Sequence, residues 1–120
     1  MPMTMNVVQP NVGQGLRALV VDDSAVSRLL ASRALRSLGF SVGVADSGPN
    51  ALHHLELDIF DFDVPNVAVV DWNIPMGGLQ FVTEVRKSEC FDNMRIMMVT
   101  SEPCPKRTEA ALDAGADGSC

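Results

Sequence analysis

Cysteine is scarce in this chain of 120 residues, which contains Cys90, Cys104 and Cys120 and no C-x-x-C pair. An odd number of cysteines without that spacing argues against a disulfide framework, and still more against a structural zinc site. Free thiols suit a reducing compartment, so a cytoplasmic location is expected.

Basic residues and long apolar runs are also few. Nine lysines and arginines stand against 15 aspartates and glutamates, which gives a formal net charge of −6. A nucleic-acid partner requires a basic patch, so this balance argues against one. No apolar stretch approaches the roughly 18 residues of a membrane span, and the N-terminus lacks the basic-then-apolar layout of a secretion signal. We therefore expect neither membrane insertion nor nucleic-acid binding.

The chain does contain enough apolar sequence for one packed domain, being 47% hydrophobic and 20% charged. Residues 1–15 are poor in periodic apolar residues and carry Pro2, Pro10, Gly13 and Gly15. Such a stretch is typical of a flexible leader. The domain itself is expected over residues 16–120.

Short apolar runs alternate with segments of helical period along this domain. The runs predict strands over 16–21, 40–45, 67–70 and 95–99, and the periodic segments predict helices over 24–38, 47–57, 78–88 and 106–114, with a loop over 58–66. Near-continuous apolar strands indicate burial on both faces, as in a parallel sheet. Strict alternation with helices then predicts an α/β doubly wound fold.

Polar residues stand at the ends of three of these strands. Asp22 and Asp23 follow the first strand, Asp71 the third and Thr100 the fourth. Ligands of such sheets bind outside the carboxyl ends of the strands, and parallel neighbours lie about 4.8 Å apart. If these strands are adjacent, three carboxylates meet at one edge. A few hard oxygen ligands suit Mg²⁺, which would offset the repulsion between the two adjacent aspartates.

Four segments together resemble a known family. VVDDSAVSR, VVDWNIP, MMVTSE and ALDAGADG occur in the order and approximate spacing found in the receiver domain of bacterial response regulators, most of all in the CheY-like chemotaxis type. The resemblance extends from about residue 16 to the last residue. It implies a flavodoxin-like fold with strand order 2-1-3-4-5.

The resemblance also implies a role for each polar residue at the edge. Asp71 would be the phosphoacceptor, whose carboxylate attacks phosphorus to form an acyl phosphate. Asp23 and Asp71 would ligate Mg²⁺ directly, together with the backbone carbonyl of Asn73, whereas Asp22 would act through a metal-bound water. Thr100 would bind a phosphoryl oxygen and swing inward on activation. A separate cofactor-binding residue is not expected.

As a receiver, the protein would take its phosphoryl group from a sensor histidine kinase and signal to a downstream protein by a changed surface. It would support its own phosphorylation and dephosphorylation without being an enzyme in its own right. One alternative is a receiver-like interaction module that does not switch. A phosphatase of the haloacid dehalogenase kind is a weaker alternative, because such enzymes carry D-x-D at the first strand, where this chain has Asp22-Asp23-Ser24.

Two departures from the family pattern lead to further expectations. The loop after Asp71 reads Pro75 to Leu79, PMGGL, one residue shorter than usual and without the usual aspartate. The family's lysine at the end of a fifth strand would fall about two residues beyond Cys120. We therefore expect a C-terminally incomplete domain with strand order 2-1-3-4, lacking the fifth strand and the last helix. Its strand over 95–99 would then be an exposed apolar edge, open to self-association.

Overall fold

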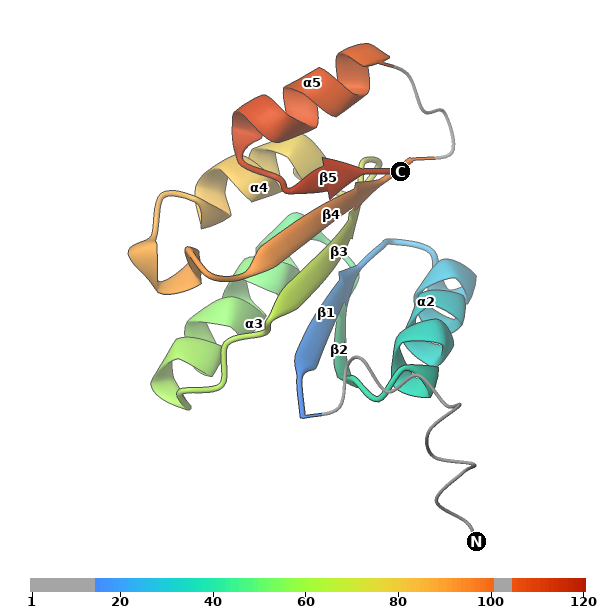
Figure 1. The fold of residues 1–120 in the computed structure, drawn as a ribbon, viewed down its shortest axis with the longest axis vertical. Helices are drawn as coiled ribbons and strands as arrows, with labels where there is room; N and C mark the ends of the chain where they lie inside the picture. The colour runs from blue at the N-terminus through green and yellow to red at the C-terminus, as the bar shows by residue number, and fades with distance from the viewer. Residues whose placement is uncertain (1–14, 101–104) are drawn as a thin grey trace, which may run out of the picture.

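A computed structural model describes residues 15–100 and 105–120 of the chain. Its single described sheet has five parallel strands in the order β2-β1-β3-β4-β5 (Figure 1). The strands are β1 (Arg17–Val21), β2 (Ser41–Ala45), β3 (Val67–Asp71), β4 (Arg95–Val99) and β5 (Gly118–Ser119). The predicted α/β architecture is confirmed, and so is the strand order 2-1-3-4-5 that the resemblance to receiver domains implied. The expected leader, apart from Gly15, lies outside the described residues.

Helices cover both faces of this sheet. They are α2 (Ala25–Ser37), α3 (Gly48–Phe60), α4 (Gly78–Val85) and α5 (Pro105–Ala114), with a short 3₁₀ helix η1 (Glu89–Phe91). Among the described elements, α2 lies alone on one face, while α3, α4 and α5 lie on the other (Figure 1). None of the helices in the described ranges combines the length and the apolarity that crossing a bilayer requires.

The main core fills the space between the sheet and the three helices on one face. Alternate strand residues point into it and are almost fully buried, namely Leu19, Val21, Ala68, Val70, Ile96 and Met98. Leu55 of α3 and Phe81 of α4 pack against them and are 0% exposed. Burial of this apolar surface is the main stabilising contribution, and it holds β1, β3 and β4 in the register that aligns their carboxyl ends.

The expectation of a missing fifth strand was wrong. Gly118 pairs with Met97 and Ser119 with Met98, and backbone N–H groups of Asp117 and Cys120 donate to Ile96 and Met98 at 2.8 and 2.9 Å. The sequence reading missed β5 because glycine and serine lack the branched or aromatic side chains that mark a strand.

Because β5 is paired with β4, β4 is not an exposed edge. The backbone N–H of Thr100 donates to the carbonyl oxygen of Cys120 at 3.1 Å, so this pairing extends to the end of the strand. The strand at this edge of the sheet is β5, which is only two residues long. Short edge strands are a common protection against edge-to-edge pairing. The predicted self-association through strand 4 therefore loses its structural basis.

The expected loop over 58–66 is also partly wrong. Helix α3 continues through Asp58 and ends only at Phe60. Leu55 and Ile59 lie four residues apart on the face that packs against the core, so tertiary packing extends the helix through an aspartate-rich stretch. The true loop begins at Asp61 and includes Phe62, which has a φ of 53° and is 97% exposed.

Candidate functional site

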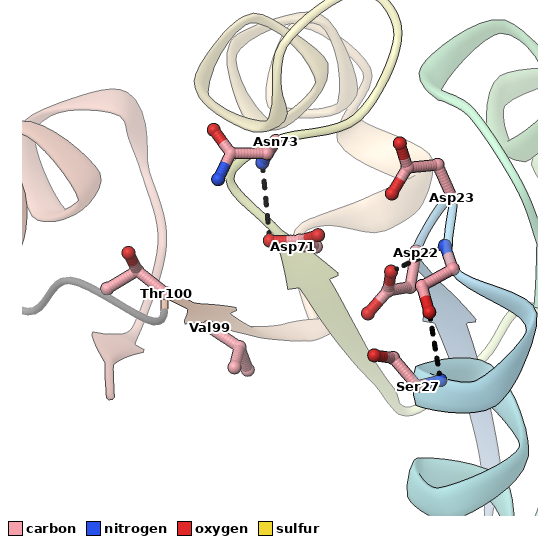
Figure 2. A pocket seen from close by; sticks show the side chains of 8 residues that line it. Asp22, Asp23, Ser27, Asp71, Asn73, Val99 and Thr100 are labelled. Atoms are coloured by element: carbon pink, nitrogen blue, oxygen red, sulfur yellow. Dashed lines mark hydrogen bonds between the residues drawn. The ribbon is translucent and has the colours of Figure 1, made fainter.

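Three carboxylates meet where β1 and β3 end. Val21 of β1 pairs with Val70 of β3, so Asp22 and Asp23 emerge beside Asp71, the last residue of β3. One carboxylate oxygen from each of the three lies within 4.8 Å of those of the other two. Figure 2 shows the three side chains turned toward a common space. The structure thus brings together the three aspartates that the sequence singled out.

The space between them is a pocket of about 330 Å³. Its lining consists of Asp22, Asp23, Ser24, Ser27, Asp71, Asn73, Val99 and Thr100 (Figure 2). All five predicted site residues are in this set. Ser24, Ser27 and Val99 were not predicted to line it, although Ser27 stands four residues after Asp23, a spacing that would have pointed to it.

The backbone around the adjacent aspartates is held in place by hydrogen bonds. The N–H of Asp22 donates to the carbonyl oxygen of Ala45 at 3.1 Å, and the guanidinium of Arg28 donates to the carbonyl oxygen of Asp22 at 2.7 Å. Ser24 caps α2, since its hydroxyl oxygen accepts from the N–H of Ser27 at 3.3 Å. These bonds place both carboxylates at the N-terminus of a helix, where negative charge is favoured.

Among the described residues that line the pocket, three are carboxylates and none has a cationic side chain. Burial raises the pKa of Asp22, and the neighbouring carboxylates of Asp71 and Asp23 raise it further, against a lowering effect of the backbone N–H of Ser24, which donates to Asp22 Oδ1 at 2.9 Å. A divalent cation would remove this repulsion. The donor set fits Mg²⁺, because it consists of hard oxygens from few side chains beside an open pocket with room for metal-bound water.

The shortened loop after Asp71 folds back tightly toward the sheet. The N–H of Gly77 donates to the carbonyl oxygen of Ile74 at 2.7 Å, and that of Gly78 to Trp72 at 3.1 Å. Met76 and Gly77 have φ values of 84° and 87°, a region that non-glycine residues rarely adopt. The loop keeps Asn73 at the pocket.

Asn73 is tied to the phosphoacceptor candidate through its backbone. Its N–H donates to Asp71 Oδ1 at 3.2 Å (Figure 2). The bond fixes one carboxylate oxygen of Asp71 toward the loop. It also keeps the Asn73 main chain beside the three carboxylates, as a main-chain metal ligand would require.

Thr100 lies across the pocket, at the end of β4. It is 9% exposed, and Figure 2 shows its side chain pointing away from the carboxylate of Asp71. Its Oγ1 accepts a hydrogen bond from the guanidinium of Arg107 at 2.7 Å. The same guanidinium lies over the ring of Trp72, 5.4 Å from its centroid. Sequence reasoning missed Arg107, because nothing in the spacing of helix α5 shows that it reaches the strand ends.

Comparison with known proteins agrees with this geometry. The chain matches the response regulator receiver domain family over residues 18–119. It is 35% identical over 105 residues to the chemotaxis protein CheY of Pseudomonas aeruginosa, a match that covers 86% of this chain and 81% of that protein.

Solved structures show the same fold. The chemotaxis response regulator CheY4 of Vibrio cholerae superposes with a TM-score of 0.76 at 30% identity, covering 87% of this chain and 83% of that one. The receiver domain of the histidine kinase CKI1 from Arabidopsis thaliana, complexed with Mg²⁺ and BeF₃⁻, superposes with a TM-score of 0.78 at 26% identity, covering 93% and 84%. The chain therefore belongs to the family of response regulator receiver domains.

Proposed function

We propose that this protein is a phosphorylatable receiver whose phosphoacceptor is Asp71. The observation that carries the proposal is the convergence of three carboxylates within 4.8 Å at the strand ends, with Thr100 lining the same pocket. Of the three, Asp71 alone is the last residue of a strand at the centre of the sheet. An incoming phosphorus atom would reach it through the open side of the pocket.

The phosphoryl group would come from a phosphohistidine of a sensor histidine kinase. A carboxylate oxygen of Asp71 forms the new bond to phosphorus, while the bond between phosphorus and the imidazole nitrogen breaks and its electron pair stays on the imidazole. Aligned carboxylates are competent nucleophiles in such transfers. Hydrolysis of the acyl phosphate by water returns Asp71 to its carboxylate form and releases inorganic phosphate, so the protein is a signalling element that resets itself and is not an enzyme acting on a separate substrate.

Mg²⁺ would be held by Asp23, Asp71 and the main-chain carbonyl of Asn73, with Asp22 acting through a bound water. When bound, the ion neutralises the charge that accumulates on the phosphoryl oxygens during transfer. The hydroxyl of Thr100 would donate to one of those oxygens once it turns inward. The CKI1 receiver domain, solved with Mg²⁺ and BeF₃⁻, supports this assignment by its similarity.

Output would pass through protein contacts to a downstream target in the cytoplasm. The similarity to chemotaxis proteins favours a target protein that acts in chemotaxis. We propose no nucleic-acid output from this domain, since its net charge is −6.

The test uses Trp72, which is the single tryptophan of a chain without tyrosine. Its fluorescence is followed while Mg²⁺ and then beryllium fluoride are added. We expect a change on each addition and loss of the second change in Asp71→Asn. Asp46→Asn is the matched control, because Asp46 also follows a strand at this edge of the sheet but is not part of the carboxylate cluster.

This titration and a separate assay of phosphate release distinguish the alternatives. A wild-type protein that responds to neither addition would be a non-switching interaction module. Sustained release of phosphate from a phosphate ester, with Asp71 required, would instead indicate a phosphatase.

A further inference from the structure

One side chain connects the pocket to helix α5. The guanidinium of Arg107, in the first turn of α5, donates to Thr100 Oγ1 at 2.7 Å and covers the Trp72 ring at 5.4 Å. Thr100 follows β4, and Trp72 follows Asp71 on β3. The three residues therefore bridge two strand ends and a helix at the border of the pocket.

These two contacts of Arg107, with Thr100 and with Trp72, have a physical reason to be stable in the resting protein. A hydrogen bond from a charged donor is stronger than one between neutral groups. A guanidinium over an indole ring is attracted by the negative face of the ring. Arg107 and Trp72 are both half-buried, so water screens these interactions only in part.

The ring of Trp72 lies between the end of β3 and the guanidinium of Arg107. Its backbone N–H donates to the carbonyl oxygen of Val99 at 3.1 Å, which joins the ends of β3 and β4. Within the part of the chain that the structure describes, the buried Nε1 atom has no hydrogen-bond partner. Packing and the guanidinium thus orient the ring, and a move of Arg107 changes the surroundings of the indole.

We propose that Arg107 is a positioning residue that holds the Thr100 hydroxyl in its outward orientation and so opposes the phosphorylated arrangement of the site. The inference rests on the proposed function, in which Thr100 must turn toward a group on Asp71. Figure 2 shows the Thr100 side chain turned away from Asp71. When this side chain rotates toward Asp71, either Oγ1 leaves the guanidinium of Arg107, or the guanidinium follows it and leaves the indole of Trp72. Either way, a contact of the resting state is lost.

The sign of the effect distinguishes this role from the opposite one. If Arg107 restrains Thr100, its removal makes the inward orientation easier to reach, and a phosphoryl mimic binds more tightly. If Arg107 instead travels with Thr100 and contacts the phosphoryl oxygens, its removal weakens binding of the mimic.

The test is a titration of the Mg²⁺-saturated full chain with beryllium fluoride, followed by Trp72 fluorescence, with ¹⁹F NMR as an independent measure of bound fluoride. In Arg107→Gln the half-saturating concentration should fall by about three- to tenfold, in line with the loss of a partly exposed charged contact. Arg107→Lys keeps the charge but loses the planar guanidinium, so its half-saturating concentration should lie between those of wild type and Arg107→Gln. Lys106→Gln, a neighbouring exposed cation, should leave the midpoint unchanged.

A double-mutant cycle with Thr100→Ala tests whether Arg107 acts through Thr100. Thr100→Ala alone should raise the midpoint, and Arg107→Gln should then have no further effect. A fall of equal size in the Thr100→Ala background, or an unchanged or raised midpoint in Arg107→Gln alone, would overturn the inference while leaving the proposed function intact. A wild type that binds no beryllium fluoride would overturn both.

Discussion

The main-chain oxygen of Asp71 lies so close to Gly78 that a Cβ atom on residue 78 would be 2.4 Å from it. Gly78 is the first residue of α4, and its own N–H donates to the carbonyl oxygen of Trp72 at 3.1 Å. The start of the helix is therefore in direct contact with the strand that carries the phosphoacceptor. This contact closes the shortened loop that borders the pocket.

Replacing Gly78 with alanine should be strongly destabilising. The added methyl group would meet main-chain atoms of Asp71 and Trp72, which cannot move aside as a flexible side chain could. We expect the free energy of unfolding in urea to fall by about 2–3 kcal/mol or more, as for overpacked sites. Gly43→Ala is the matched control, because the nearest side-chain atom to its Cβ would be 3.9 Å away. Equal stability of the two variants would contradict the packing described here.

Arg86 fastens α4 to the segment that leads into β5. Its guanidinium donates to the carbonyl oxygens of Gly115, Phe91 and Met94 at 2.7–2.8 Å and forms an ion pair with Asp117 at 3.2 Å. Arg86→Ala would leave three partly buried carbonyl oxygens without this donor. We expect the free energy of unfolding, measured in urea, to fall by about 2–4 kcal/mol.

The control for Arg86 is Arg95, which pairs with the same carboxylate of Asp117 at 3.2 Å but has a side chain 77% exposed. Arg95→Ala should cost less than about 1 kcal/mol, as exposed ion pairs usually do. If the two substitutions cost the same, the three carbonyl contacts of Arg86 add nothing measurable to stability.

Asp22 should oppose folding in the absence of a divalent cation and support it in its presence. Its carboxylate is half-buried beside those of Asp71 and Asp23, and Asn at this position keeps the oxygen that accepts from the N–H of Ser24. Asp22→Asn should therefore melt higher than wild type in a chelator. Mg²⁺ should raise the melting temperature of wild type, by mass action on the folded state, and that of Asp22→Asn much less. An identical response of both proteins to Mg²⁺ would exclude Asp22 from the metal site.

The pH dependence of stability should include a contribution from Asp58 near the end of α3. Burial raises its pKa above 3.8, and Asp63 and Asp61 raise it further, whereas Arg17 and His54 lower it. The folded state then binds the proton more tightly than the unfolded state, so stability falls as the pH rises from 3.8 through the raised pKa. Asp58→Asn should be more stable than wild type near neutral pH, by less than about 1 kcal/mol.

The measurement for Asp58 is the difference in melting temperature between wild type and Asp58→Asn across a pH series. The advantage of the variant should shrink as the pH falls through the raised pKa of Asp58 toward 3.8, and it should change no further once both states of wild type are protonated. An advantage that grows at acidic pH would mean that the ion pair of Asp58 with Arg17, at 3.8 Å, outweighs the cost of burial.

The pattern of apolar residues in the sequence was enough to predict the strands whose side chains are buried in the core. Runs such as Leu19 to Val21 and Ile96 to Val99 indicate buried strands, and the polar residue after each run marks the edge where the site forms. Four strands and the cluster of Asp22, Asp23 and Asp71 could be found in this way. Their convergence follows from parallel strands ending at one edge, with the adjacency of those strands implied by the resemblance to receiver domains.

Features that depend on tertiary contacts escaped prediction. Strand β5 is formed by Gly118 and Ser119, whose side chains give no strand signal, and backbone pairing with β4 alone reveals it. The bond from Arg107 to Thr100 joins a helix to a strand end, and no periodicity encodes the direction of a long side chain. The last turn of α3 was missed because packing of Ile59 overrides the turn-like composition around it.

The phosphoacceptor role of Asp71 is tested most directly by locating a phosphoryl group on the protein. The chain is incubated with acetyl phosphate and Mg²⁺, the acyl phosphate is trapped by reduction, and the modified residue is identified by peptide mass spectrometry. We expect modification of Asp71 that requires Mg²⁺ and disappears in Asp71→Asn, while Asp46→Asn retains it. Modification at another residue, or of Asp71 without any need for a divalent cation, would contradict this expectation.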